Sequence, residues 1–343
     1  MSELSPPPGL RVIGSAEVAK QVDADREGCL AAVRDAYLAH AAGVTVNPHS
    51  SFLRFPDRPR DRIIALPAFL GSTGEATPRS GIKWIASYPG NTEHGFPRAS
   101  ALLVLNDYDT GYPYAVLESS IISATRTAGS AVLGAETLLG GRNAGSVGFI
   151  GTGLIADHVR LFLRDLGWSI GEFRLFDTNP ANAARFGEKL ATDGPAGRVT
   201  VVDDVAGAFS ADLVVLATVA GEPHVHDPAL LAHNPVVLHL SLRDLAPELI
   251  LAATNVTDDV DHAVRERTSL HLAEQQVGDR SFVHGTIADV LRGELVPPAD
   301  RATIFAPFGL GVLDLAVGGW VHDRVRDAGG GQVVPNFFDE ITR

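Results

Sequence analysis

A glycine-rich segment at residues 146–156 carries the clearest chemical signal in the sequence. An apolar run ends in Gly-Thr-Gly-Leu-Ile-Ala at residues 151–156, and a helical pattern continues to Leu166. A helix that begins at such a turn presents unpaired N–H groups and a partial positive charge to a pyrophosphate. The order of apolar run, glycine turn and helix predicts a dinucleotide-binding site. The alternative is an ordinary glycine turn in an α/β sheet.

An acidic residue follows the second apolar run of this region. Asp177 lies about 26 residues after Gly151, slightly beyond the usual spacing of about 20. An acid there accepts hydrogen bonds from both hydroxyls of an adenosine ribose and repels a 2′-phosphate, so we expect NAD rather than NADP. The residues expected to contact the cofactor are Gly151, Gly153, Leu154, Ile155, Asp177, Thr178, Ala217, Thr218, Ser241 and Leu242.

Three ionisable side chains are candidates for chemistry on a substrate. Asp244 lies in a loop after an apolar run, Lys83 lies inside another apolar run, and Arg126 lies in a helical segment of small residues. A buried cation is costly without a partner, and a guanidinium can hold a carboxylate through two hydrogen bonds. Each of the three residues also has a purely structural interpretation. Asp244 would cap a helix or join an ion pair, Lys83 would extend into solvent from an edge strand, and Arg126 would pair with Glu118 or Glu136.

The composition restricts the class of protein. The chain has 343 residues, 45% of them apolar, with one cysteine and a formal net charge of −13. No basic run stands out, so no nucleic-acid partner is expected. The polar N-terminus has no signal-peptide pattern, and no apolar run reaches the ~18–20 residues that span a bilayer. We therefore expect a cytoplasmic protein without a membrane partner, in which Cys29 is a buried thiol.

Two clusters resemble metal sites in composition. His224 and His226 lie near Glu222, and residues 258–262 read Asp-Asp-Val-Asp-His. The first cluster has no third ligand at helical or hairpin spacing. The second begins a helical segment, where acids interact favourably with the helix dipole. We therefore expect no metal.

The chain divides into two predicted domains by pattern. Residues 17–42 predict one helix, short β-like runs follow up to residue 117, and residues 119–140 predict a helix of small residues. From residue 145 to about 303, strands alternate with helices, as in a parallel doubly wound sheet. The strands expected there are 146–150, 172–176, 199–202, 212–217, 235–240 and 254–257, and a last helix is expected at 312–328.

The fold class that follows is α/β. We expect a Rossmann-type doubly wound parallel sheet in residues 129–304, which form the NAD-binding domain. An α+β substrate-binding and dimerisation domain is expected from residues 1–128 together with residues 305–343, because chain ends often lie close together.

Three longer motifs resemble those of the ornithine cyclodeaminase/mu-crystallin family. They are Lys-Trp-Ile-Ala-Ser-Tyr-Pro-Gly-Asn at 83–91, Leu-Asn-Asp-Tyr-Asp-Thr-Gly-Tyr-Pro at 105–113 and Ser-Ala-Thr-Arg-Thr-Ala at 123–128. The resemblance extends from about residue 44 through 319. Segments 97–100, 121–126 and 241–248 are most similar to the branch that acts in 2,3-diaminopropionate biosynthesis.

The resemblance implies a tightly bound NAD, a homodimer built through the first domain and a small amino-acid substrate. It implies that Lys83 and Arg126 hold the substrate carboxylate and that Asp244 handles protons, so that Lys83 and Asp244 are the expected catalytic residues. The pKa of Asp244 would then be tuned toward the working pH by burial. Arg98 and, more weakly, Arg54 are expected to bind additional carboxylates. Further cofactor contacts are expected from Arg126, Thr127 and Gly309.

The implied reaction is NAD-dependent oxidation of N-(2-amino-2-carboxyethyl)-L-glutamate. The iminium formed would hydrolyse to 2-oxoglutarate and L-2,3-diaminopropionate, a precursor of a siderophore or an antibiotic. The loop at 242–248 lacks the lysine of the cyclodeaminase motif, which argues against ornithine cyclisation. A cyclodeaminase-type lyase, a ketimine reductase and a small-ligand binder remain the alternatives.

Overall fold

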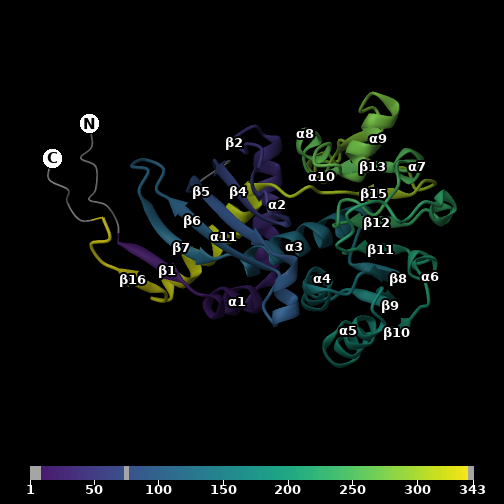
Figure 1. Cartoon of the computed structure of the whole chain (residues 1–343), viewed down its shortest axis with the longest axis horizontal. Helices are drawn as coiled ribbons and strands as arrows, with labels where there is room; N and C mark the ends of the chain where they lie inside the picture. Colours follow the sequence, from purple (N-terminus) through teal and green to yellow (C-terminus); the bar gives the residue numbers. More distant parts are fainter. Residues whose placement is uncertain (1–8, 73–76, 339–343) are drawn as a thin grey trace. The chain divides into compact units, whose positions relative to one another are not determined.

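The computed structural model describes residues 9–72 and 77–338, which form two compact units. Unit 1 comprises the described residues up to Arg126 and those from Leu310, and unit 2 comprises Thr127–Gly309. Figure 1 labels the elements of both units. Helix α3 (Ser120–Leu139) contains the boundary between them. None of the described helices has the length and apolar character needed to cross a membrane.

Unit 1 is built on an eight-stranded sheet in the order β16-β1-β7-β6-β5-β4-β2, with β3 paired to β4. Its strands are antiparallel to their neighbours except for the parallel pair β1 and β7. The strands are β1 (Leu10–Ile13), β2 (Thr45–Val46), β3 (Ser51–Phe55), β4 (Arg58–Leu70), β5 (Arg79–Ser87), β6 (Ala99–Asn106), β7 (Pro113–Glu118) and β16 (Gln332–Val334).

Helix α11 (Gly311–Asp327) packs against β4, β5, β6 and helix α2 (Arg26–Ala41). Alternate side chains of β6 are buried, with Leu103 and Leu105 at 0% exposure, whereas Leu102, next to Leu103, is 50% exposed. Gly318 of α11 lies so close to this strand that a Cβ there would stand 2.0 Å from Leu103 Cδ2. The helices thus cover one face of the sheet, and the other face stays partly open.

The single helix expected at residues 17–42 is wrong. The structure has α1 (Ser15–Ala24) and α2, separated at Asp25, whose backbone is non-helical at φ −157° and ψ 76°. The Asp25 side chain accepts a hydrogen bond from the Gly28 N–H at 2.8 Å and so begins α2 as its N-cap. The apolar spacing continues across this break because both helices bury one side, so periodicity alone does not reveal it.

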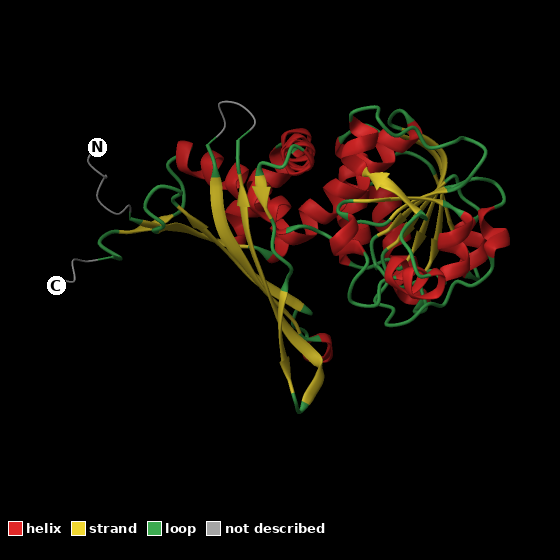
Figure 2. Ribbon diagram, turned by 90° about the horizontal axis from the view of Figure 1, so that it is seen from above, coloured by secondary structure: helices red, strands yellow, loops and turns green. Residues whose placement is uncertain are grey.

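Unit 2 contains an eight-stranded, wholly parallel sheet in the order β10-β9-β8-β11-β12-β15-β13-β14. In Figure 2, helices lie on both sides of it, which confirms the predicted Rossmann-type α/β class. The strands are β8 (Asn143–Ile150), β9 (Ser169–Phe176), β10 (Arg198–Val201), β11 (Leu213–Leu216), β12 (Val236–His239), β13 (Thr254–Thr257), β14 (Val283–Thr286) and β15 (Thr303–Phe305).

The six strands expected in this sheet are all present, with ends shifted by up to three residues. Two strands, β14 and β15, were not expected. β15 has only three residues, yet it lies inside the sheet between β12 and β13, where its residues are buried from solvent on both sides. So short a run carries too little pattern to be read from the sequence. The helices of this unit are α4 (Leu154–Asp165), α5 (Pro180–Asp193), α6 (Val205–Phe209), α7 (Pro247–Ala252), α8 (Val260–Ala263), α9 (Ser269–Val277) and α10 (Ile287–Leu291).

Candidate active site

The glycine turn follows β8 at the point where the strand order of the sheet reverses between β8 and β11. Gly151 has φ +83°, and a Cβ there would stand 2.7 Å from the Ala217 carbonyl oxygen, so only glycine fits. Gly153 is the N-cap of α4, and a Cβ on it would meet no described atom within 4 Å. Among the described side chains none caps this helix. The first N–H groups of α4 therefore remain open to an anion beside the switch point.

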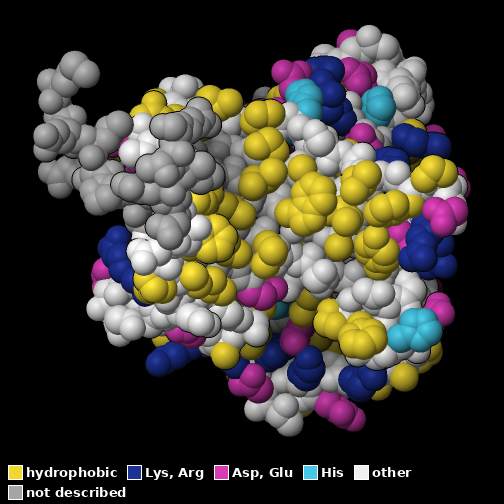
Figure 3. Space-filling model, turned by 60° about the vertical axis from the view of Figure 1, so that its left-hand side comes forward, with side chains coloured by type: hydrophobic (Ala, Val, Ile, Leu, Met, Phe, Trp, Pro, Cys, Tyr) yellow, Lys and Arg dark blue, Asp and Glu magenta, His cyan; other side chains and the backbone are white. Residues whose placement is uncertain are grey.

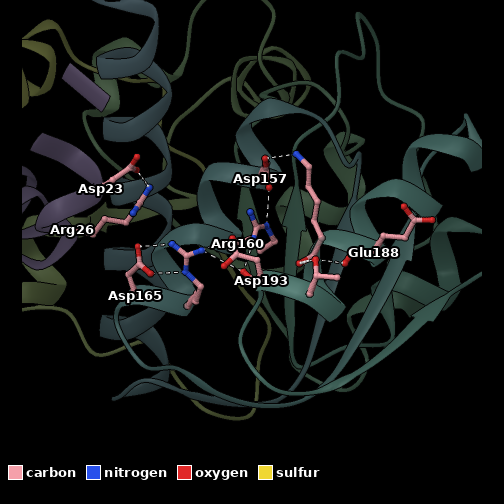
Figure 4. A network of polar contacts seen from close by, with 10 residues as sticks. Asp23, Arg26, Asp157, Arg160, Asp165, Glu188 and Asp193 are labelled. Atoms are coloured by element: carbon pink, nitrogen blue, oxygen red, sulfur yellow. Dashed lines mark hydrogen bonds and ion pairs between the residues drawn. The ribbon is translucent and has the colours of Figure 1, made fainter. Parts of the chain in front are cut away.

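Helix α4 is fixed by charged contacts with α5, shown in Figure 4. Arg160 is 4% exposed and lies 2.7 Å from Asp157 in the first turn of α4. The Lys189 ammonium of α5 also contacts Asp157, at 2.6 Å, and Asp193 at the end of α5 pairs with Arg160 at 3.4 Å. These contacts hold the helix whose N-terminus faces the predicted pyrophosphate position.

Asp177 lies at the end of β9, next to the glycine turn. Its Oδ2 accepts hydrogen bonds from the Thr152 N–H and hydroxyl, each at 2.9 Å, and its Oδ1 accepts one from the Asn179 N–H at 2.9 Å. Burial alone would raise the pKa of this carboxyl, but these hydrogen bonds outweigh it and lower the pKa. The side chain is therefore a fixed anion, as an acceptor of ribose hydroxyls must be.

The other residues expected at the cofactor follow strands of the same parallel sheet. Thr178 follows β9, Ala217 and Thr218 follow β11, and Ser241 and Leu242 follow β12. They therefore share the carboxyl edge of the sheet with the glycine turn.

Gly309 follows β15 and is held by a residue that the sequence did not single out for this role. The Asp258 carboxylate accepts the Phe308 N–H at 2.9 Å and the Gly309 N–H at 2.6 Å. Burial raises the pKa of Asp258 against the effect of these hydrogen bonds. Its neighbour Asp259 is the N-cap of α8 and accepts the His262 N–H at 2.9 Å, as expected for an acid that begins a helix. Within the described ranges, no group of three or more His, Cys, Asp or Glu side chains is placed to hold a metal.

Asp244 lies in the loop after β12, and its side chain is wholly buried. It accepts hydrogen bonds from the Thr218 and Ser241 hydroxyls. Two imidazoles also contact it, His224 Nε2 at 2.9 Å and His239 Nε2 at 3.3 Å.

The expectation that burial tunes the pKa of Asp244 toward neutral pH is wrong. Burial does raise the pKa, but the hydrogen bonds from His224, His239 and Ser241 outweigh it, and the pKa falls well below its usual range. The sequence did not indicate that these partners converge on one carboxylate. Asp244 is an ionised acceptor throughout the neutral range.

The two cations expected to bind substrate, Lys83 and Arg126, lie together in unit 1. Lys83 is on β5, and its side chain is 2% exposed; its Nζ lies 2.7 Å from Asp314 Oδ2 and 3.2 Å from Ser123 Oγ. Arg126 Nε lies 3.2 Å from the other oxygen of Asp314, a fully buried carboxylate on α11. The pairing of Arg126 with Glu118 or Glu136 is therefore not what the structure shows.

Asp314 was missed, although an acid in the apolar segment Val-Leu-Asp-Leu-Ala at 312–316 is itself a signal. Its position determines the charge of the cluster. The pKa of Lys83 is lowered to about 8, mainly by burial; the Arg126 charge also lowers it, and Asp314 opposes both effects. Two cations share one internal anion, so the cluster retains a positive charge at neutral pH.

Arg98 and Arg54 belong to a second group of cations in unit 1. Arg98 Nε donates to Ser87 Oγ at 3.3 Å, and burial together with the nearby Arg62 guanidinium lowers the pKa of Arg98. In the sheet, Arg62 of β4 lies opposite Ser87 on one side and opposite Arg54 of β3 on the other. Arg62 was not predicted. It lies among other charged residues in a strand where apolar and polar residues do not alternate clearly. The face of the sheet to which its side chain points could therefore not be predicted from the sequence.

The two groups of cations share one face of the sheet. Lys83 and Ser87 are four residues apart on β5, so their side chains point to the same side. Arg62 and Arg54 are directly opposite partners in antiparallel pairs, which places them on that side as well. One face of unit 1 therefore carries a row of cations that runs from Lys83 toward β3.

The chain is similar to known proteins over most of its length. The profile of the ornithine cyclodeaminase/mu-crystallin family matches residues 12–329. N-((2S)-2-amino-2-carboxyethyl)-L-glutamate dehydrogenase of Staphylococcus aureus is 27% identical over 304 residues, which cover 86% of this chain and 89% of that protein.

Two solved structures are similar over nearly the whole chain. The Delta(1)-pyrroline-2-carboxylate reductase of Thermococcus litoralis, in complex with NADH and L-proline, has a TM-score of 0.85 at 22% identity and covers 94% of this chain and 100% of its own. An archaeal alanine dehydrogenase dimer with bound NAD has a TM-score of 0.82 at 25% identity and covers 96% of this chain and 99% of its own.

Proposed function

This chain belongs to the ornithine cyclodeaminase/mu-crystallin family, and we propose that within it the protein oxidises N-(2-amino-2-carboxyethyl)-L-glutamate. It is an NAD-dependent oxidoreductase that acts on the CH–NH group of an amino acid. The proposed products are 2-oxoglutarate and L-2,3-diaminopropionate. The observation that carries the choice of substrate is the row of cations on one face of unit 1.

The residues of unit 2 fit NAD. Gly151 and Gly153 leave the N-terminus of α4 accessible, and Asp177 supplies an ionised acceptor for the ribose hydroxyls. We assign further contacts to Leu154, Ile155, Thr178, Thr218 and Leu242 from their places at the same edge. When bound, the oxidised nicotinamide accepts a hydride from the α-carbon of the substrate.

The proposed substrate carries three carboxylates, and unit 1 offers several cations to receive them. The Lys83–Asp314–Arg126 cluster has an unbalanced positive charge, which one further carboxylate would neutralise. Arg98 and Arg54, together with Arg62, lie along the same sheet and would bind the outer carboxylates. A substrate with a single carboxylate, such as alanine, would leave this second group without a ligand. The tricarboxylate therefore matches the charges better.

The chemistry requires a proton to leave before the α-C–H bond breaks. A protonated amine has no lone pair to stabilise the cation that develops at the α-carbon. Asp244 and its hydrogen-bond partners form the centre proposed to handle this proton. Water then adds to the iminium, and the carbinolamine breaks down to the two products.

The test is an assay of the purified protein with the glutamate–diaminopropionate conjugate and NAD, followed by the absorbance of NADH. We expect stoichiometric NADH, 2-oxoglutarate and L-2,3-diaminopropionate. L-Alanine and L-ornithine are the comparison substrates, and Arg98→Gln is expected to raise KM for the conjugate but not for alanine. Turnover of ornithine to a cyclic imino acid without net NADH, or turnover of alanine alone, would contradict the proposal.

The open face of the unit 1 sheet supports a homodimer. Trp84 of β5 lies opposite Leu102 of β6, and they are 43% and 50% exposed. Hydrophobic side chains gather on the face of the molecule that Figure 3 presents. Apolar residues in such numbers are costly in water, and a second copy of the chain would cover them. Sedimentation analysis should give a dimer for the wild type and a monomer for Leu102→Glu; a monomeric wild type would refute this assembly.

A further inference from the structure

We propose that the His224 imidazole takes the proton from the substrate amine and that Asp244 is its positioning residue. This inference rests on the proposed function, because it needs an amino-acid substrate whose amine must be deprotonated. It assigns to His224 a role that the family resemblance implied for Asp244. Three features of unit 2 carry it: the environment of Asp244, the attachment of His224 and the position of His239.

The Asp244 carboxylate is in a poor position to accept a further proton. Its side chain is fully buried, and four side-chain groups already donate to it or contact it. Each of these hydrogen bonds stabilises the ionised form and keeps the carboxylate an acceptor only. A general base needs the opposite property, a pKa near the working pH, so that it is unprotonated before the step and accepts the proton readily.

His224 is attached directly to this carboxylate and reaches the surface. Its Nε2 lies 2.9 Å from Asp244 Oδ1, and its side chain is 37% exposed. The backbone holds the two residues next to each other, because the N–H groups of His224 and Val225 both donate to the Asp244 carbonyl oxygen, at 3.0 and 2.9 Å. The imidazole orientation is therefore set by the same loop that carries the carboxylate.

The ionised carboxylate also determines which ring nitrogen is free. Asp244 accepts but cannot donate, so His224 Nε2 carries the hydrogen and Nδ1 keeps its lone pair. A carboxylate that fixes the tautomer of an imidazole and stabilises the imidazolium is a recurrent arrangement in proton transfer. In the step proposed, the ammonium N–H bond breaks, its proton moves to His224 Nδ1, and the nitrogen keeps the electron pair that later forms the C=N bond.

His239, the other imidazole at Asp244, is not equivalent. Its side chain is 1% exposed, and its Nε2 lies 3.3 Å from Asp244 Oδ2 and 3.1 Å from the Asp244 backbone nitrogen. A buried nitrogen that contacts Asp244 on both sides is not available to take a proton from substrate. Glu222 and His226 lie in the same loop as His224, and within the described residues neither is hydrogen-bonded to Asp244, so they serve as controls rather than alternatives.

The first experiment compares variants of the full-length protein. His224→Gln keeps an amide that can donate to Asp244 but has no base, and His226→Gln is the matched control in the same loop. We expect His224→Gln to lower kcat/KM by about 10²- to 10³-fold, the range for loss of a general base, and His226→Gln to stay within about twofold. Added imidazole should restore His224→Ala at least about tenfold, because the position is exposed. NAD affinity, measured by fluorescence, verifies that each variant is folded.

The second experiment needs no turnover. Histidine-ring ¹⁵N NMR of the cofactor-free chain, with His224→Gln to assign the signal, should show His224 protonated at Nε2. Asp244→Asn should alter that tautomer. A His224→Gln variant with more than about a third of wild-type kcat/KM, or a His224 ring protonated at Nδ1, would overturn the inference. A wild type inactive on the conjugate but active on alanine would refute only the proposed substrate, and the variants are then compared on alanine.

Discussion

The buried carboxylate of Asp314 controls the charge state of Lys83, and Asp314→Asn removes that control while keeping the side-chain size. In the wild type, Asp314 bonds Lys83 at 2.7 Å and Arg126 at 3.2 Å. Burial and Arg126 lower the pKa of Lys83 to about 8, and only Asp314 opposes them. Without the carboxylate, both remaining effects disfavour the ammonium form.

The size of the effect follows from the geometry. Unit charges about 4 Å apart interact by about 4 kcal/mol at an effective dielectric constant of 20, which changes the protonation equilibrium of Lys83 by about 10³. Lys83 is mostly charged at neutral pH in the wild type and would be mostly neutral in Asp314→Asn. A substrate carboxylate then loses one charged hydrogen bond worth about 1.5–3 kcal/mol, so kcat/KM should fall by about 10- to 100-fold.

The assay is the pH profile of kcat/KM. Because protonated Lys83 is the form that binds the carboxylate, wild-type kcat/KM should be lost as pH rises through about 8. In Asp314→Asn the same loss should occur at lower pH. Ser123→Ala is the control, because it removes a neutral contact of Lys83 at 3.2 Å and should leave the profile in place. If Asp314→Asn binds NAD normally and its profile falls at the wild-type pH, the reasoning is refuted.

Two further predictions concern the cofactor site. Gly151→Ala should lower the melting temperature and abolish NAD binding because its Cβ would meet the Ala217 carbonyl at 2.7 Å, whereas Gly153→Ala should weaken NAD binding with an unchanged melting temperature. Equal melting temperatures for the two variants would contradict this. Asp177→Ser should raise the Kd for NAD and lower the Kd for NADP, because the fixed anion that excludes a 2′-phosphate is gone. Isothermal titration calorimetry measures both constants. An unchanged preference for NAD over NADP would show that Asp177 does not face the ribose.

The features that were predicted correctly depend on residues close together in the sequence. The glycine turn, the helix after it and Asp177 at the end of the next strand are each set by neighbours in the chain, and the strands of unit 2 are continuous apolar runs. The break at Asp25 and the short strand β15 were not readable, because one is hidden in a continuous apolar pattern and the other is too brief.

Contacts between distant segments account for what was missed. Asp314 lies 231 residues from Lys83 in the sequence, and Arg62 gains its neighbours only through strand pairing. The low pKa of Asp244 depends on Thr218, His224 and His239, which lie in other loops or strands. A carboxyl pKa reflects the balance of burial against hydrogen bonds, and that balance does not exist until the chain is folded.

By itself, the sequence determined the residue types available for chemistry, the parallel α/β sheet and the nucleotide turn, because side-chain identity and short-range periodicity are properties of the linear chain. Only the tertiary structure decided which charges neutralise one another and which nitrogen of His224 is left free, because electrostatic energies depend on distance and on exclusion of water.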